Sequence, residues 1–153
     1  MFIALPPGSR ITPDDIERNI GISKEYNAFE LTEALGEKDV LKANRIISHF
    51  AANPADNPIQ PVIGALFGYF LKLLKYHALP EKSFEAAGAV FGVARYPNLV
   101  KKYLEIARRY DKRKLMEIIS MIREYDLKSK GLESTSGVSQ GDLLKEMVYK
   151  ILH

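Results

Sequence analysis

Side chains that commonly carry catalysis or bind metals are few and scattered in this sequence of 153 residues. It has no cysteine, which excludes disulfides, thiolate metal sites and a cysteine nucleophile. The three histidines, His49, His77 and His153, lie too far apart along the chain to indicate a metal centre. Glu30 and Glu33 share one side of a predicted helix, but with no histidine nearby we interpret them as solvated carboxylates. The chain has neither a P-loop motif nor a visible set of nucleophile, acid and base, so we expect no catalytic residues and no cofactor.

Basic side chains are the other residues that could do chemistry, and they are concentrated in one third of the chain. Residues 95–130 carry 11 basic and 5 acidic side chains, a net charge of +6, whereas residues 1–94 carry a net charge of −2. Basic groups neutralise phosphates and aromatic rings stack on unpaired bases, so this segment is compatible with nucleic acid. Its tyrosines, Tyr96, Tyr103 and Tyr110, also share the spacing of an apolar helical stripe. Core packing beneath a solvated helix surface is therefore the alternative interpretation.

The elements that position these side chains are predicted to be helices throughout. Apolar residues recur at helical spacing, and no segment alternates apolar and polar residues long enough to indicate a strand. Capping residues at Thr12, Asn27, Asp111 and Ser139 mark helix starts. The predicted helices cover residues 12–21, 27–36, 39–52, 59–79, 81–91, 97–110, 112–131 and 139–153, with a small polar loop at 131–137. We therefore predict an all-α fold, a single helical bundle of about seven to eight helices around one core.

The segment 59–79 is the most apolar, with 14 of its 21 residues apolar or aromatic and spread around the helix. A helix that is apolar on nearly all sides is normally surrounded by others, so we expect this one to be central. Gly64 and Gly68, four residues apart, predict close approach of a neighbouring backbone. We also expect Phe29, Val40 and Leu99 to lie on buried helix faces. The longest uncharged run, 57–71, is shorter than the roughly 20 apolar residues of a membrane span, so we expect no membrane insertion.

Several segments, in order, resemble the last domain of the delta subunit of the bacterial DNA polymerase III clamp loader. The run NAFELTEALGEKDVLKANRII resembles the opening of that domain, and NPIQPVIGALFGYFLKLLKY resembles its long apolar helix. GVARYPNLVKKYLEIARRY matches a family element through Gly92, Pro97, Lys101 and Lys102. REYDLKSKG matches a helix end, and GDLLKEMVYKIL resembles the closing helix. The resemblance covers roughly residues 10–153.

The resemblance implies a domain organisation and a function. Residues 1–21 would be the tail end of a preceding AAA+ lid domain, and residues 22–153 a helical C-terminal collar domain. The collar would oligomerise with the gamma/tau and delta-prime subunits, in the complex that loads the sliding clamp on primed DNA during DNA replication. It would have no catalytic activity itself, although the complex serves a DNA-directed DNA polymerase, a nucleotidyltransferase. It would reach the sliding clamp only through an N-terminal domain, touch primed DNA indirectly or weakly, and work in the bacterial cytoplasm at the nucleoid-associated replisome.

A collar domain needs apolar side chains that face its neighbours, and two predicted helices have candidates. The expected subunit interface consists of Phe67, Phe70, Leu71, Leu74, Met147, Tyr149 and Ile151. The expected DNA-proximal charges are Lys112, Arg113, Lys128 and Lys130. The alternative function is a stand-alone helical nucleic-acid-binding domain that uses the basic segment 95–130. The two hypotheses differ in whether the isolated chain binds partner subunits or DNA.

Overall fold

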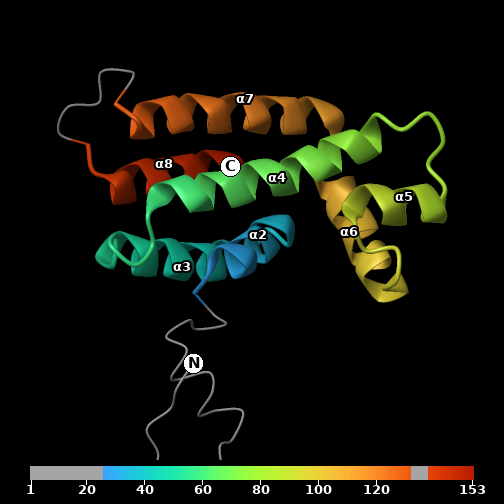
Figure 1. The fold of residues 1–153 in the computed structure, drawn as a ribbon, viewed down its shortest axis with the longest axis horizontal. Coiled ribbons are helices and arrows are strands. Elements are labelled where there is room, and N and C mark those ends of the chain that lie inside the picture. The colour runs from blue at the N-terminus through green and yellow to red at the C-terminus, as the bar shows by residue number, and fades with distance from the viewer. Residues whose placement is uncertain (1–25, 132–137) are drawn as a thin grey trace, which may run out of the picture.

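The computed structural model describes residues 26–131 and 138–153, and every regular element within these ranges is a helix. The described part of the chain forms a single all-α bundle, as the sequence predicts (Figure 1). The predicted helix at 12–21 and most of the predicted loop at 131–137 lie outside the described residues. The seven described helices are α2 (Ala28–Gly36), α3 (Val40–Ala52), α4 (Ile59–His77), α5 (Phe84–Phe91), α6 (Pro97–Arg109), α7 (Lys112–Ser129) and α8 (Gln140–Leu152).

Short polar side chains begin most of these helices, because they accept hydrogen bonds from backbone N–H groups that have no partner within the helix. The carboxamide oxygen of Asn27 accepts from the third residue of α2 at 2.8 Å. Asp111 does the same for α7 at 2.7 Å, and Ser139 for α8 at 3.1 Å. The helix starts predicted at these three residues are therefore confirmed.

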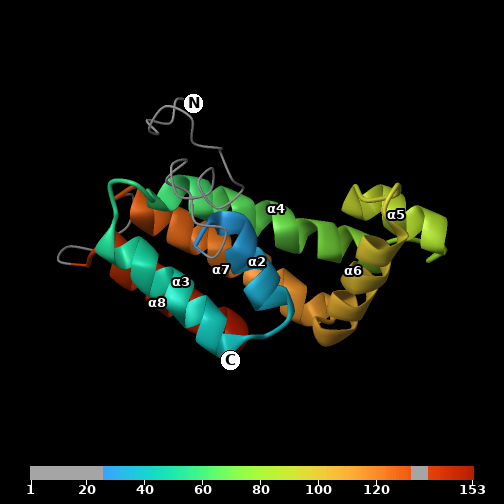
Figure 2. The same ribbon diagram turned by 90° about the horizontal axis from the view of Figure 1, so that it is seen from below.

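Helix α4 runs through the middle of the bundle, as its apolar composition predicts. It packs against α2 and α6 on one side and against α7 on the other, with further contacts to α5 and α8 (Figures 1 and 2). Its two ends are fixed to other helices by hydrogen bonds. The Gln60 amide donates to the Ser129 hydroxyl oxygen at 2.9 Å, and His77 Nε2 lies within 3.0 Å of the Ala107 and Tyr110 carbonyl oxygens. The start of α4 is thus joined to the end of α7, and the end of α4 to the end of α6 just before α7 begins, so α4 and α7 are antiparallel.

The core on the α2 and α6 side of α4 is closed by aromatic side chains. The ring of Phe70 meets that of Tyr110 edge to face, with 5.4 Å between centroids. The buried Tyr110 hydroxyl donates to the Leu35 carbonyl oxygen at the end of α2. The Tyr69 ring lies over Gly36, so closely that a β-carbon at Gly36 would overlap its hydroxyl oxygen. Glycine at position 36 is therefore what allows α2 to lie this close to α4.

The surface differs from the sequence prediction at several apolar residues. Phe29 and Leu99 are 64% and 39% exposed, and Val40 is exposed as well, so the expectation that they are buried is wrong. Each lies within the first turn of its helix, where fewer neighbouring elements cover the side chain. The close approach of a neighbouring backbone expected at Gly64 and Gly68 is also not observed, because a β-carbon at either would meet nothing within 4 Å. No described backbone approaches α4 closely there.

Candidate interaction surface

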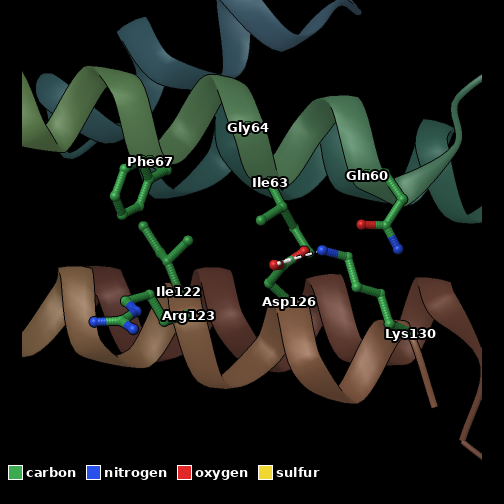
Figure 3. A pocket seen from close by; sticks show the side chains of 8 residues that line it. All are labelled: Gln60, Ile63, Gly64, Phe67, Ile122, Arg123, Asp126 and Lys130. Carbon is green, nitrogen blue, oxygen red and sulfur yellow. Dashed lines mark hydrogen bonds and ion pairs between the residues drawn. The ribbon is translucent and has the colours of Figure 1, made fainter. Parts of the chain in front are cut away.

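A large, open groove lies between α4 and α7. It has a volume of about 710 Å³. Four residues of α4, three of α7 and the residue that caps α7 line it, and each set lies at helical spacing along one side of its helix (Figure 3). The lining residues are Gln60, Ile63, Gly64 and Phe67 from α4, Ile122, Arg123 and Asp126 from α7, and Lys130 at the C-terminal cap of α7.

Apolar side chains from both helices meet inside this groove. Ile63 and Ile122 belong to the core and are nearly inaccessible to solvent, whereas Phe67 is only partly buried. Gly64 adds backbone without a side chain, so the α4 wall is low at that point. Water in contact with such apolar surface can be released at a favourable free energy when another molecule covers it.

The α7 rim of the groove is charged, and its charges differ in how they are neutralised. The Lys130 ammonium lies 3.0 Å from the Asp126 carboxylate, one helical turn away (Figure 3). Arg123 projects from the same rim and forms no ion pair with any described residue. The groove therefore combines an apolar floor with one cation that the described protein does not neutralise.

The predicted interface residues fall into two groups. Phe67, Leu71 and Leu74 are half-buried and lie at positions i, i+4 and i+7 of α4, which places them along one side of the helix. Tyr149 is 64% exposed on α8, where its ring lies 4.5 Å from the ring of His153. These four side chains have surface available to a partner.

Phe70, Met147 and Ile151 are fully buried, so the expectation that they are exposed is wrong. Phe70 faces the aromatic core beside α6, and the two α8 residues belong to the same continuous core. Helix α8 lies against both α3 and α7, so its apolar stripe is used within the domain. The sequence offers more apolar residues than a core needs, but it does not indicate which of them remain exposed.

The predicted DNA-proximal residues do not form one cluster. Lys112 and Arg113 begin α7, whereas Lys128 and Lys130 lie at its other end, about 25 Å away by the rise of an α-helix. Three of the four have acidic partners one turn away: Arg113 with Glu117, Lys128 with Glu124 and Lys130 with Asp126. The Lys128 ammonium also lies 4.9 Å from the centre of the Tyr125 ring.

Of the groove residues on the α7 side, the sequence indicates a function only for Lys130, which it predicts as a DNA-proximal charge. Arg123 lies within the basic segment 95–130, but its charge alone does not distinguish it as a groove residue. One available signal was the spacing of charges along α7, since the residues four positions before and after Arg123 are Ile119 and Leu127. Arginine without an acid at either position has no i,i+4 partner on its own helix.

Buried polar groups elsewhere in the fold are mostly structural. Burial raises the pKa of the Tyr69 and Tyr110 phenols well above the ordinary value. Lys102 links α6 to α2 through Glu33 at 3.0 Å and Glu37 at 3.3 Å, and the hydrogen bond to Glu33 raises the pKa of its ammonium. Within the described ranges, no three potential metal-ligating side chains come together. The groove is therefore the feature of the described surface best suited to binding.

Comparisons with known proteins do not assign the chain to a family. No family model, no curated protein and no solved structure matches it. None of the helices in residues 26–131 and 138–153 combines the length and apolar character that crossing a membrane requires.

Proposed function

We propose that this chain is a non-catalytic assembly domain, the collar domain of a delta subunit of the bacterial DNA polymerase III clamp loader. In this role it would join gamma/tau and delta-prime subunits and help to hold the loader together while the sliding clamp is placed on primed DNA. The ordered set of sequence segments described above motivates the identity. The observation that carries an assembly role is the half-buried apolar stripe of α4, which continues the floor of the α4–α7 groove.

The stripe has the properties of an interface. Phe67, Leu71 and Leu74 keep part of their surface in water although they lie on the longest helix of the described fold. Met116, exposed on α7, adds a flexible apolar side chain of the kind that is enriched in protein interfaces. A partner that covers this face would bury apolar surface without any change to the core.

Size-exclusion chromatography with light scattering tests the proposal directly. The chain is mixed with the collar domains of gamma/tau and delta-prime from the same source, and one larger co-eluting species is expected. Leu71→Glu should abolish co-elution, because it replaces an apolar side chain of the stripe with a carboxylate that the partner would bury. Leu41→Glu is the matched control, since Leu41 is exposed on α3 and does not line the groove. Elution of the wild-type chain alone in all mixtures would refute the proposal.

Nucleic-acid binding is the second candidate function, and the corner between α6 and α7 favours it. Arg108, Arg109 and Lys112 are exposed there, and Arg113 is the most accessible charged side chain of an ion pair in the described fold. A DNA-binding chain would bind primed DNA on its own, with an affinity that falls steeply as salt concentration rises. Weakened DNA binding by Arg108→Ala, without co-elution of partner subunits, would favour this second function.

A further inference from the structure

Arg123, like Lys112 and Lys114, forms no ion pair with a described residue, whereas three other cations on α7 or at its end do. Lys128 pairs with Glu124 at 2.8 Å, Lys130 with Asp126 at 3.0 Å, and Arg113 with Glu117 at 3.6 Å. Asp126 lies three residues beyond Arg123, but its carboxylate is bound to Lys130. The Arg123 guanidinium thus has five N–H donors and no carboxylate acceptor among the described residues.

The position of Arg123 makes this unused charge relevant to binding. It lines the groove beside Ile122, and Figure 3 shows it on the α7 rim opposite Phe67. A carboxylate that enters such an apolar groove loses water, and its attraction to a guanidinium then exceeds that of a pair in open solvent. Arginine beside an aromatic ring is also a combination found at the energetic centres of protein interfaces.

The shape of the groove favours a helix as its occupant. Its walls are two antiparallel helices of 19 and 18 residues, which run alongside each other for about 25 Å. Helices pack with their axes about 8–10 Å apart, and closer approach needs small residues at the contact. Gly64 supplies such a residue on the α4 wall of the groove, where a β-carbon would meet nothing within 4 Å.

The charges along the groove define the sign of the partner. Lys112 precedes Arg123 by about three helical turns and so lies on the same side of α7. Among the lining residues, the two cations Arg123 and Lys130 outweigh the single carboxylate of Asp126, and Lys112 adds positive charge beyond the groove. An occupant that carries acidic side chains beside an apolar stripe would complement both features.

We infer that the α4–α7 groove binds an acidic amphipathic helix of a partner protein. Apolar side chains of that helix would pack against Ile63, Phe67 and Ile122, and one of its carboxylates would pair with Arg123. The inference rests on the proposed assembly function and adds the chemistry of the partner at that surface. Nucleic acid fits this groove poorly, because the apolar floor offers nothing to phosphates.

The test uses two synthetic helical peptides of 18 residues that differ only in charge. Both carry leucines at i, i+4 spacing, and the residues that flank this stripe are glutamates in one peptide and lysines in the other. Each is titrated into the ¹⁵N-labelled chain and followed by amide chemical shifts. The acidic peptide should bind saturably and shift the amides of Ile63, Gly64, Phe67 and Ile122, whereas the basic peptide should not.

Charge reversal at Arg123 identifies the contact. Arg123→Glu should lower the affinity for the acidic peptide by about tenfold or more and allow the basic peptide to bind. Arg113→Glu is the control, since Arg113 is 90% exposed on the same helix and does not line the groove, and it should leave both affinities unchanged. Absence of saturable binding, shifts outside the groove, or equal affinity for both peptides would overturn the inference. The same shifts caused by primed DNA would also overturn it.

The result remains separable from the assembly proposal. One outcome is that the chain does not co-elute with clamp-loader domains but binds the acidic peptide through Arg123. This result would refute the clamp-loader identity and support binding of an acidic helix in the groove. The opposite outcome is co-elution that Arg123→Glu leaves unchanged, with no binding of either peptide. This result would support the clamp-loader identity and refute binding of an acidic helix in the groove.

Discussion

The two flanks of α4 have similar amino-acid types but different surroundings. On the flank that faces α2 and α6, Phe70 and Leu73 have no exposed surface, and Tyr69 is 8% exposed. On the flank beside α7, Phe67, Leu71 and Leu74 are only half-buried. The closed flank is covered by two helices, whereas the open flank meets one helix and then a groove. An apolar helix at the centre of a bundle can therefore be structural on one side and available for binding on the other.

Alanine at the two phenylalanines should give the largest difference between the flanks. We expect Phe70→Ala to lower the free energy of unfolding by about 3–5 kcal/mol, because it leaves a cavity in the closed core. Phe67→Ala should lower the free energy of unfolding by only about 1 kcal/mol, because part of the ring is already in contact with water. Urea denaturation followed by circular dichroism measures both. Equal losses would contradict the distinction between the flanks.

The second largest effect is expected from alkaline pH, which should destabilise the fold through the buried tyrosines of the closed flank. Burial raises the pKa of the Tyr69 and Tyr110 hydroxyls, so both stay protonated in the folded state when unfolded tyrosines ionise near pH 10. Stability should be unaffected by these groups below about pH 10 and fall above it, by about 1.4 kcal/mol per pH unit for each tyrosine.

Urea denaturation between pH 8 and pH 11 measures this fall. Tyr69→Phe should remove its share of the slope, whereas Tyr149→Phe should not, since Tyr149 is exposed. An unchanged slope in Tyr69→Phe would show that this tyrosine does not cause the effect.

Adding a methyl group should have opposite effects at two glycines of the bundle. Gly36→Ala should destabilise by about 1–3 kcal/mol, because its β-carbon would overlap the Tyr69 hydroxyl oxygen and lie 3.1 Å from Ile106 Cδ1. Gly64→Ala should stabilise by about 0.5–1 kcal/mol, since the added carbon enters open space within a helix. Thermal melting of the two variants gives the sign of each effect. Destabilisation by Gly64→Ala would show that the groove flank is closed.

Removal of single buried tyrosine hydroxyls should give the smallest changes in stability. It should distinguish a hydroxyl that donates a hydrogen bond from one that has no described partner. Tyr110→Phe loses the hydrogen bond to the Leu35 carbonyl, which still accepts from the Lys38 amide, so we expect a loss of about 1 kcal/mol. The Tyr69 hydroxyl has no hydrogen-bond partner among the described residues. Tyr69→Phe should therefore be neutral or slightly stabilising at pH 7. Paired urea titrations at that pH distinguish the variants, and a larger loss in Tyr69→Phe would indicate an unseen partner.

Local signals in the sequence predicted the helices well. Asn27, Asp111 and Ser139 accept the hydrogen bonds that begin three helices. The predicted start of α5 at residue 81 was wrong, because Ser83 caps this helix and it begins at Phe84. These signals act within a few residues of the chain, so they can be read without knowledge of the fold. The central place of α4 was also predictable, because its composition leaves few polar faces for solvent.

The candidate site was only partly predictable. The excess of apolar side chains on α4 predicts Phe67, Leu71 and Leu74 as interface residues, and these keep some exposed surface, but the same reasoning includes Phe70, which is buried. Helical spacing places Phe67 and Phe70 only about 60° apart around α4, and the positions of α6 and α7 determine which of them is covered. Arg123 belongs to the groove only because α7 lies antiparallel to α4.

By itself, the sequence determined that the described chain is helical, where most of its helices begin, and which helix is central. Those properties follow from capping, turn residues and apolar periodicity, which act over one or two helical turns. Only the tertiary structure decided which apolar side chains stay accessible, that Gly36 must be small, and that Arg123 faces an apolar groove. These properties depend on how helices distant in sequence pack, and a single helix contains no information about which of its flanks a neighbour will cover.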